Sequence, residues 1–400
     1  MKLHDLLARH GRVIGLGFGL TLLSSFGQTF FISLSAPDIR ATFGITHGGF
    51  GLIYSAATLT SGLLMIWIGG VIDRVRVGLY VTIALVGLSL AAAGLSLAPN
   101  PIVLGLCLFG LRLFGQGMTS HAGITSTARL PAGLRGRSVA VAALGFPAGE
   151  AILPGIALVT VAALGWVAAW RVVALAILVA LALGWALSFA LGPDRSQAAD
   201  MEAPSPHEPG PRWVDLLRDW RFLALMPAFM GYPAIVTAFF FHQRLIADMK
   251  GWSPELLASG ITTFALVSVV VVMTAGSLVD RFGAVRLSHF YLIGLMSASV
   301  VLALTEGALS VFPFFALVGL TAGGTNVVAA SVLAELFGTR HLGKIRALAG
   351  SVMVVASATT PGLVGLLFDA AVPLPTICLC FAAYLAFATA MTFLLPNPRA

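Results

Sequence analysis

Long apolar stretches follow one another along the whole sequence, separated by short polar segments. Each stretch reaches roughly the 20 residues that a helix needs to cross the hydrocarbon core of a bilayer. The pattern therefore predicts an all-α membrane protein with twelve transmembrane helices, at residues 13–36, 48–71, 78–98, 102–128, 138–162, 165–191, 221–246, 256–280, 286–306, 309–336, 345–369 and 373–395.

The longest polar interruption, residues 192–220, divides these helices into two sets of six. Its first part is rich in Pro, Ala, Ser and charged residues, a composition that favours a disordered linker. Its last part, 213–220, has the mixed polarity of a short helix that lies at a membrane surface. We therefore expect an N-terminal six-helix bundle at 1–191, a cytoplasmic linker with a short interfacial helix at 192–220, and a C-terminal six-helix bundle at 221–400.

The composition excludes a soluble protein. Hydrophobic residues make up 58% of the chain and charged residues 10%, and the mean hydropathy is +0.97, whereas about a quarter of the residues in soluble domains are charged. The net charge of +7 is scattered over short loops, which argues against a nucleic-acid partner. Eighteen Lys and Arg residues fall on one predicted side and three in loops on the other. By the positive-inside rule we expect a multi-pass protein of the cell membrane with both termini cytoplasmic.

A short phrase occurs twice at a constant distance. Gly69–Arg74 has the form Gly-x-x-x-Asp-Arg, and the same form returns 207 positions later at Gly276–Arg281. The same offset also carries Pro154-Gly155 onto Pro361-Gly362. A register held over such a distance indicates two copies of one structural unit, which in so hydrophobic a chain is typical of secondary transporters.

The doubled phrase resembles the signature loop of the major facilitator superfamily, and twelve spans in two halves fit the same family. The resemblance implies a transporter that works by alternating access, in which these loops latch the cytoplasmic gate. We expect the glycines to let a neighbouring helix approach closely and the acids to accept backbone N–H groups. The gating residues predicted in this way are Gly69, Asp73, Arg74, Gly276, Asp280 and Arg281.

Glu335 is a further candidate for the gate. It ends the tenth predicted helix and is expected to pair with Arg281 or Arg286. The position in register with it in the first half is Ala128, so the second half is expected to hold the fuller charge network.

Polar positions that differ between the halves are candidates for substrate binding. Arg112 lies in the middle of the fourth helix, where an arginine is costly unless it faces a wet cavity or a partner. Helical spacing predicts one polar stripe of Arg112, Gln116 and Thr119. The alternative for Arg112 is a structural lock on a neighbouring carboxylate.

Four more residues complete the predicted substrate site. The resemblance implies that helices one, four, seven and ten line the cavity, which would place Gln28 and Asn326 there. His242 and Arg244 end the seventh helix as cations that the first half lacks, and they either bind an anion or reach the outer interface.

Two titratable residues are candidates for proton coupling. Glu150 lies about as deep in the fifth helix as Arg112 does in the fourth, and the alternatives are a coupling carboxylate or an ion pair with Arg112. His121 has a side chain that titrates near neutral pH, the alternative being a satisfied polar residue near the inner interface.

The sequence contains no nucleotide-binding loop, metal-ligand cluster or nucleophile–base arrangement in a polar segment. We therefore expect neither an enzyme nor a bound cofactor or metal. The protein is expected to be a secondary transporter in the lipid bilayer that binds a small-molecule substrate and a proton or other coupling ion. It is expected to function as a monomer. The cations favour a small organic anion. Segments 335–346 and 367–369 also resemble bacterial monocarboxylate and oxalate carriers. The alternatives are a proton-driven exporter of hydrophobic or cationic compounds and a membrane sensor that does not transport.

Overall fold

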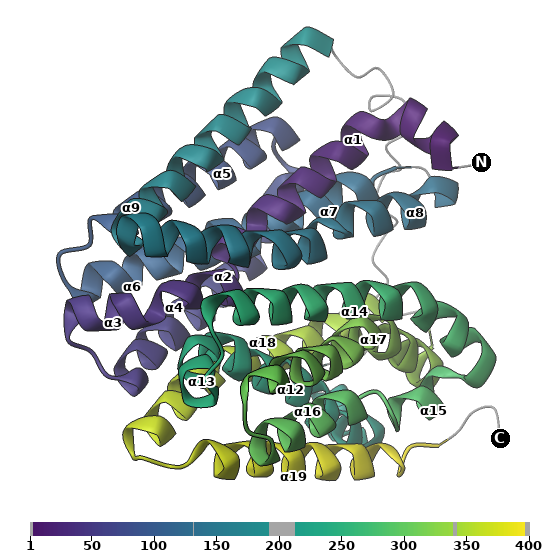
Figure 1. The fold of residues 1–400 in the computed structure, drawn as a ribbon. Coiled ribbons are helices and arrows are strands. Elements are labelled where there is room, and N and C mark those ends of the chain that lie inside the picture. The colour runs from purple at the N-terminus through teal and green to yellow at the C-terminus, as the bar shows by residue number, and fades with distance from the viewer. Residues whose placement is uncertain (1–2, 131, 192–212, 339–341, 397–400) are drawn as a thin grey trace. The chain divides into compact units, whose positions relative to one another are not determined.

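The computed structural model describes residues 3–130, 132–191, 213–338 and 342–396, and these are helical almost throughout (Figure 1). No strand occurs within those ranges. The first part of the predicted linker, residues 192–212, lies outside the described residues. A helix does occur at Trp213–Arg218, within the segment for which the sequence predicts a short one.

The chain divides into two compact units, Met1–Phe43 with Ala56–Pro206, and Gly44–Ser55 with His207–Ala400. Helices of the first unit are α1 (Leu3–Leu23), α2 (Thr29–Ile32), α3 (Ala36–Phe43), the later part of α4 (His47–Ile68), α5 (Val77–Ser96), α6 (Pro101–Gly110), α7 (Ser120–Ala128), α8 (Ala132–Ala143) and α9 (Gly145–Leu191). Between them lie the short irregular segments η1 (Ser24–Gly27), η2 (Ser33–Ser35), η3 (Gly69–Asp73) and η4 (Leu111–Thr119). In this unit α5 packs along α9, and α1 packs against α7, α8 and α9.

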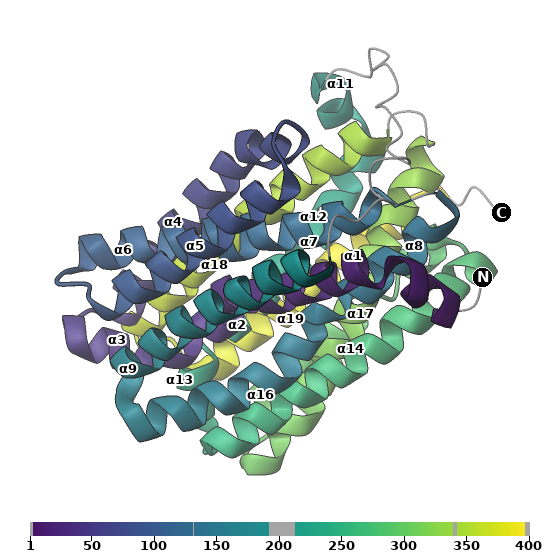
Figure 2. The ribbon, with the colours of Figure 1, turned by 90° about the horizontal axis from the view of Figure 1, so that it is seen from above.

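The second unit contains the start of α4 and the remaining helices, which are α11 (Trp213–Arg218), α12 (Trp220–Phe241), α13 (Gln243–Lys250), α14 (Pro254–Phe282), α15 (Ala284–Ser288), α16 (Ile293–Leu304), η5 (Ala308–Ser310), α17 (Val311–Phe337), α18 (Leu342–Asp369) and α19 (Leu374–Thr392). Its main contacts pair α14 with α17, α12 with α18 and α16 with α19, and Figure 2 shows α14 beside α17. A buried cluster around Phe222, Leu225 and Val332 forms one core of this unit.

The predicted membrane helices are present. Ten helical stretches of the described chain are long and apolar enough to cross a membrane, and an eleventh arises if His10–Gly27 and Thr29–Phe43, bent by 45°, form one span. The stretch Leu134–Leu187 has 54 residues, about 80 Å of helix, far more than the ~30 Å hydrocarbon core. It is interrupted at Gly165 (φ 78°, ψ 160°). Division there gives two spans and restores the twelve that the hydropathy pattern predicts.

Several helices begin where the sequence carries a start signal. Asn100 precedes Pro101, and its side-chain oxygen accepts the N–H groups of Ile102 and Val103 at 3.1 and 3.0 Å. Ser253 precedes Pro254 and accepts the N–H of Leu256 in the same way. These caps satisfy N–H groups that have no partner inside their own helix.

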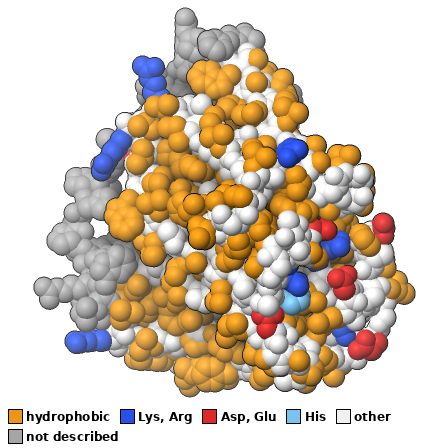
Figure 3. Space-filling model, turned by 90° about the vertical axis from the view of Figure 1, so that its left-hand side faces the viewer, with side chains coloured by type: hydrophobic (Ala, Val, Ile, Leu, Met, Phe, Trp, Pro, Cys, Tyr) orange, Lys and Arg blue, Asp and Glu red, His pale blue; other side chains and the backbone are white. Residues whose placement is uncertain are grey.

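The surface of the protein is largely apolar. Hydrophobic side chains spread over most of the face shown in Figure 3. Met273 and Trp67 are 79% and 69% exposed, an exposure that suits contact with lipid tails because water would penalise it.

Candidate functional site

The first membrane span is broken near its middle, and the fourth span is irregular at the point that meets the break. The first span changes from α1 to the short segment η1, and Gln28 has an extended backbone (φ −87°, ψ 153°). The fourth span is π-helical over η4, from Leu111 to Thr119. A π segment inside an α-helix is rare and frequently occurs at functional sites.

The two irregular segments touch through glycines. A Cβ atom built on Gly27 would overlap the carbonyl oxygen of Leu111, and one built on Gly115 would lie 2.7 Å from the Cα of Gly27. Residues without a side chain are therefore required on both helices for this close approach.

Arg112 fills the space beside the break. Its side chain is 6% exposed in a segment of apolar composition. Its Nη1 donates to the Gly27 carbonyl at 3.1 Å and to the Thr29 hydroxyl at 3.4 Å. These two contacts use the backbone and a hydroxyl of the interrupted span, and the alternative of a carboxylate partner for Arg112 stays a prediction.

Gln116 and Thr119 lie in the same π segment as Arg112. The Oε1 atom of Gln116 is buried and has no hydrogen-bond partner among the described residues. The Thr119 hydroxyl donates to the Phe114 carbonyl of its own helix at 2.6 Å. A π-helix has a wider turn than an α-helix, so the 3.6-residue spacing behind the predicted stripe does not apply here.

Helix α9 reaches the break from another side. A Cβ atom on Gly149 would overlap the Ser25 hydroxyl, so the start of α9 packs directly on η1. Glu150, the next residue, is half-buried. The break in the first span is therefore contacted by Arg112 from the fourth span and by Gly149, the neighbour of Glu150, from the fifth. Arg112 and Glu150 are the two buried or half-buried charged residues that the sequence singles out in these spans.

The first gate loop is held by a cation and an imidazole. Arg129 Nη2 lies 2.8 Å from Asp73 Oδ1 and also donates to the Ile72 carbonyl at 3.1 Å. His121 Nε2 lies 3.1 Å from the Gly69 carbonyl oxygen, so this candidate for proton coupling contacts the gate loop. Arg74 is exposed.

The second gate loop is held by an anion. Glu335 Oε2 accepts the backbone N–H of Ala284 at 2.7 Å, at the first residue of α15. This contact is to backbone, and the pairing of Glu335 with Arg281 or Arg286 stays a prediction. Asp280 is exposed, and the Arg281 guanidinium lies 5.1 Å from the centre of the Phe282 ring.

The predicted reason for the glycines of the gate loops is wrong for this structure. A Cβ atom on Gly276 would have nothing within 4 Å, and one on Gly69 would meet its nearest neighbours only at 3.8 and 3.9 Å. Neither glycine is needed here for close packing, because both positions have room for a side chain.

In the second unit, His242 lies at the junction of α12 and α13, where its backbone (φ −97°, ψ 12°) departs from the helix. His242 is 4% exposed, and its Nε2 lies 3.2 Å from the Pro361 carbonyl oxygen, between the rings of Phe241 and Phe368. Arg244 is half-buried in α13, and its Nε has no hydrogen-bond partner among the described residues. Asn326 lies in α17, but its side chain is outside the described part of the structure.

Sequence analysis missed one contact within the second unit. The Asp369 carboxylate, at the end of α18, accepts the backbone N–H groups of His47 and Gly48 at 3.0 and 2.8 Å and so caps α4. Gly51 and Gly365 make the approach of the two helices possible, since a Cβ on either would collide with backbone of the other helix. No local sequence signal connects these residues, which are more than 300 positions apart.

Comparison with known proteins identifies the family. The model of the Major Facilitator Superfamily matches residues 17–260 and 241–400. This chain belongs to that superfamily. It is therefore a secondary transporter and not an enzyme, with the all-α membrane fold of that superfamily. A search of the curated proteins gives no match.

Two similar solved structures show a bacterial homologue of the human lysosomal transporter Spinster. The inward-facing, unoccupied form has a TM-score of 0.68 and 14% identity, with 96% of this chain and 94% of that chain covered. The inward-facing, occupied form has a TM-score of 0.64 and 15% identity, with 98% and 96% covered. At these identities the likeness extends to the fold alone.

Proposed function

We propose that this superfamily member carries a small organic anion of the carboxylate type, coupled to a proton or another ion. The observation that supports this most directly is the burial of Arg112 where two irregular helix segments meet. An arginine at mid-membrane costs about 2.5–3.5 kcal/mol on insertion scales. An anionic substrate would offset part of that cost. Many secondary transporters bind substrate where membrane helices are discontinuous.

The remaining predicted residues take supporting roles in this proposal. Gln116, whose buried amide oxygen has no hydrogen-bond partner among the described residues, orients the substrate together with Gln28 and Thr119. Arg244, His242 and Asn326 contribute from the C-terminal half. Glu150 and His121 carry the coupled proton, the gate loops alternate access to the site, and one chain suffices for transport.

Uptake into proteoliposomes tests the proposal. Labelled carboxylates should enter with saturable kinetics, and Arg112→Gln should abolish uptake while Arg112→Lys retains part of it, because Lys keeps the charge but not the guanidinium geometry. Arg171→Gln is the matched control, since Arg171 is an exposed arginine. Saturable carboxylate uptake that Arg112→Gln leaves intact would contradict the role of Arg112, and lack of any carboxylate uptake would contradict the substrate class.

One observation favours a second candidate, a proton-driven exporter of hydrophobic or cationic compounds. Phe31, from the first span, packs edge-on against Phe26 at 5.0 Å and against Trp170 at 5.6 Å, next to the break that α9 contacts beside Glu150. An aromatic group with a carboxylate nearby suits a lipophilic cation. Export of such a compound that Glu150→Gln stops and Arg112→Lys spares would favour this candidate over the first.

A further inference from the structure

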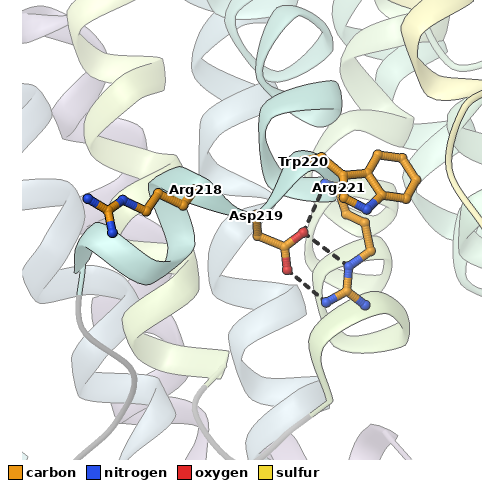
Figure 4. A pocket seen from close by; sticks show the side chains of 4 residues that line it. All are labelled: Arg218, Asp219, Trp220 and Arg221. Atoms are coloured by element: carbon orange, nitrogen blue, oxygen red, sulfur yellow. Dashed lines mark hydrogen bonds and ion pairs between the residues drawn. The ribbon is translucent and has the colours of Figure 1, made fainter.

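The junction of α11 and α12 exposes an unusual combination of side chains. Leu216 is 5% exposed and belongs to the core around Phe222, which fixes α11 to the second unit. Leu217, in contrast, is 47% exposed, and Trp220 is 54% exposed. Between these apolar groups lies a shallow surface hollow lined by Arg218, Asp219, Trp220 and Arg221 (Figure 4).

Two of the four lining residues are engaged with each other. Asp219 Oδ2 lies 2.7 Å from Arg221 Nη2, and its Oδ1 accepts both the side-chain Nε and the backbone N–H of Arg221. The Arg221 Nη1 donates to the Leu336 carbonyl at 3.2 Å, and its guanidinium lies 5.0 Å from the centre of the Phe337 ring. The one carboxylate of the hollow is therefore neutralised by an arginine that is itself packed in place.

The other two lining residues keep their donors available. The Arg218 guanidinium and the Trp220 indole N–H make no hydrogen bond or ion pair with the described residues. Figure 4 shows them extending to opposite sides of Asp219. With Asp219 neutralised, the four lining residues together present one net positive charge, on Arg218, and one uncharged donor, the Trp220 indole N–H.

The position of the hollow defines its partner. Trp220 is the first residue of the membrane-spanning helix Trp220–Phe241, so the hollow lies where a span meets the headgroup layer. Tryptophan is enriched at this depth, and a basic residue near an anionic membrane surface contributes about 1 kcal/mol of attraction.

We propose that this surface binds an anionic phospholipid, with Arg218 on the headgroup phosphate and the Trp220 ring at the boundary between headgroups and acyl chains. The indole N–H donates to a lipid oxygen, while Leu217 contacts the acyl chains. The Asp219–Arg221 pair fixes the backbone that carries both residues. This site is independent of the transported substrate.

Native mass spectrometry of the full chain tests the proposal, with phosphatidylglycerol as the anionic lipid and phosphatidylcholine as the zwitterionic one. Arg218→Gln should weaken phosphatidylglycerol binding about fivefold, the equivalent of about 1 kcal/mol, and leave phosphatidylcholine binding unchanged. Arg218→Lys should keep most of the binding, because it keeps the charge. Arg346→Gln, which removes an exposed arginine of the same unit outside the hollow, should have no effect.

Two outcomes would overturn it. An equal loss in Arg218→Gln and Arg346→Gln would mean diffuse attraction by any basic residue. The second outcome concerns free phosphate. If inorganic phosphate protected the wild type from thermal unfolding as strongly as phosphatidylglycerol does, and Arg218→Gln lost this protection, the hollow would be a site for free phosphate. If Arg218→Gln is not recovered as folded protein, phosphatidylglycerol binding is compared between Arg218→Lys and Trp220→Phe, which removes the indole N–H. Weaker binding in Trp220→Phe than in Arg218→Lys supports the proposal, and binding equal to the wild type in both overturns it.

Discussion

Asp73 and Ala284 occupy comparable loops in the two halves, but they are held by opposite charges. Asp73 receives the cation of Arg129 at 2.8 Å, while the N–H of Ala284 donates to the anion of Glu335 at 2.7 Å. Both partners come from the end of the second span after the loop: Arg129 is the C-cap of α7 in one half, and Glu335 lies in α17 in the other. Two physically different contacts therefore stabilise the loops that the repeat makes alike.

The Asp73–Arg129 ion pair should be weak and sensitive to salt. The Asp73 side chain is 71% exposed, and exposed ion pairs contribute about 0.2–1 kcal/mol. A double-mutant cycle of Asp73→Asn and Arg129→Gln, measured by thermal unfolding, should give a coupling in that range at low salt. The coupling should vanish at high salt. A coupling that persists unchanged at high salt would contradict this assignment.

Loss of the Glu335 carboxylate should cost more. Hydrogen bonds to charged groups contribute about 1.5–3 kcal/mol. Glu335→Ala is therefore expected to lower stability by about that amount, and Glu335→Gln by less because its amide oxygen still accepts from Ala284. Thermal unfolding and transport rate should rank wild type, Gln and Ala in that order. Equal stability of all three proteins would show that the contact with Ala284 contributes nothing.

Gly27→Ala should be severely destabilising, because its Cβ would overlap the Leu111 carbonyl. Overpacking typically costs about 1–3 kcal/mol, and here backbone rather than a flexible side chain has to move. Gly19→Ala is the matched control in the same span, since a Cβ there meets nothing within 4 Å. The yield of monodisperse protein and its unfolding temperature should fall for the first variant and not for the second.

Asp369→Ala should remove the cap of α4. Loss of a capping side chain costs about 0.5–2 kcal/mol, and here two N–H groups lose their acceptor. Asp248→Ala, at an exposed acid of the same unit, should leave the unfolding temperature within error of the wild type. Equal effects of the two substitutions would remove any special role of Asp369.

The Asp219–Arg221 ion pair should make the stability of the folded protein depend on pH. The hydrogen bond from the Arg221 side chain lowers the pKa of Asp219 below its ordinary value. A lowered folded-state pKa means that the ion pair contributes its full stability above the unfolded-state value of about 3.9, and loses it as the pH falls toward the folded-state pKa. The stability difference between wild type and Asp219→Asn, followed by thermal unfolding, should therefore shrink as the pH drops below about 4. A difference that grows on acidification would contradict the sign.

The membrane helices were predictable because they follow from composition. A stretch of apolar residues long enough to span the bilayer must satisfy its backbone internally, and a helix does so. The gate role of the loops at Gly69 and Gly276 stays a prediction that rests on the repeat.

The break in the first span was not predictable, because its cause lies elsewhere in the sequence. Gly27 is compatible with a regular helix, and only the approach of Gly115, 88 positions away, explains why it must be glycine there. The π turn in η4 likewise changes the faces that a 3.6-residue period assigns to Gln116 and Thr119. Periodicity describes one helix at a time, whereas these features depend on two helices in contact.

The interruption at Gly165 has a practical consequence for mapping the sidedness of the chain. A single glycine interrupts the helical stretch Leu134–Leu187, so the connection between these two spans has only one non-helical residue. A protease that cuts extended loops would find no loop at this connection, and an inserted tag would interrupt a helix. Accessibility experiments on this side of the membrane therefore have to use the other connections, such as residues 44–46 and 251–253, where the chain leaves one helix before it enters the next.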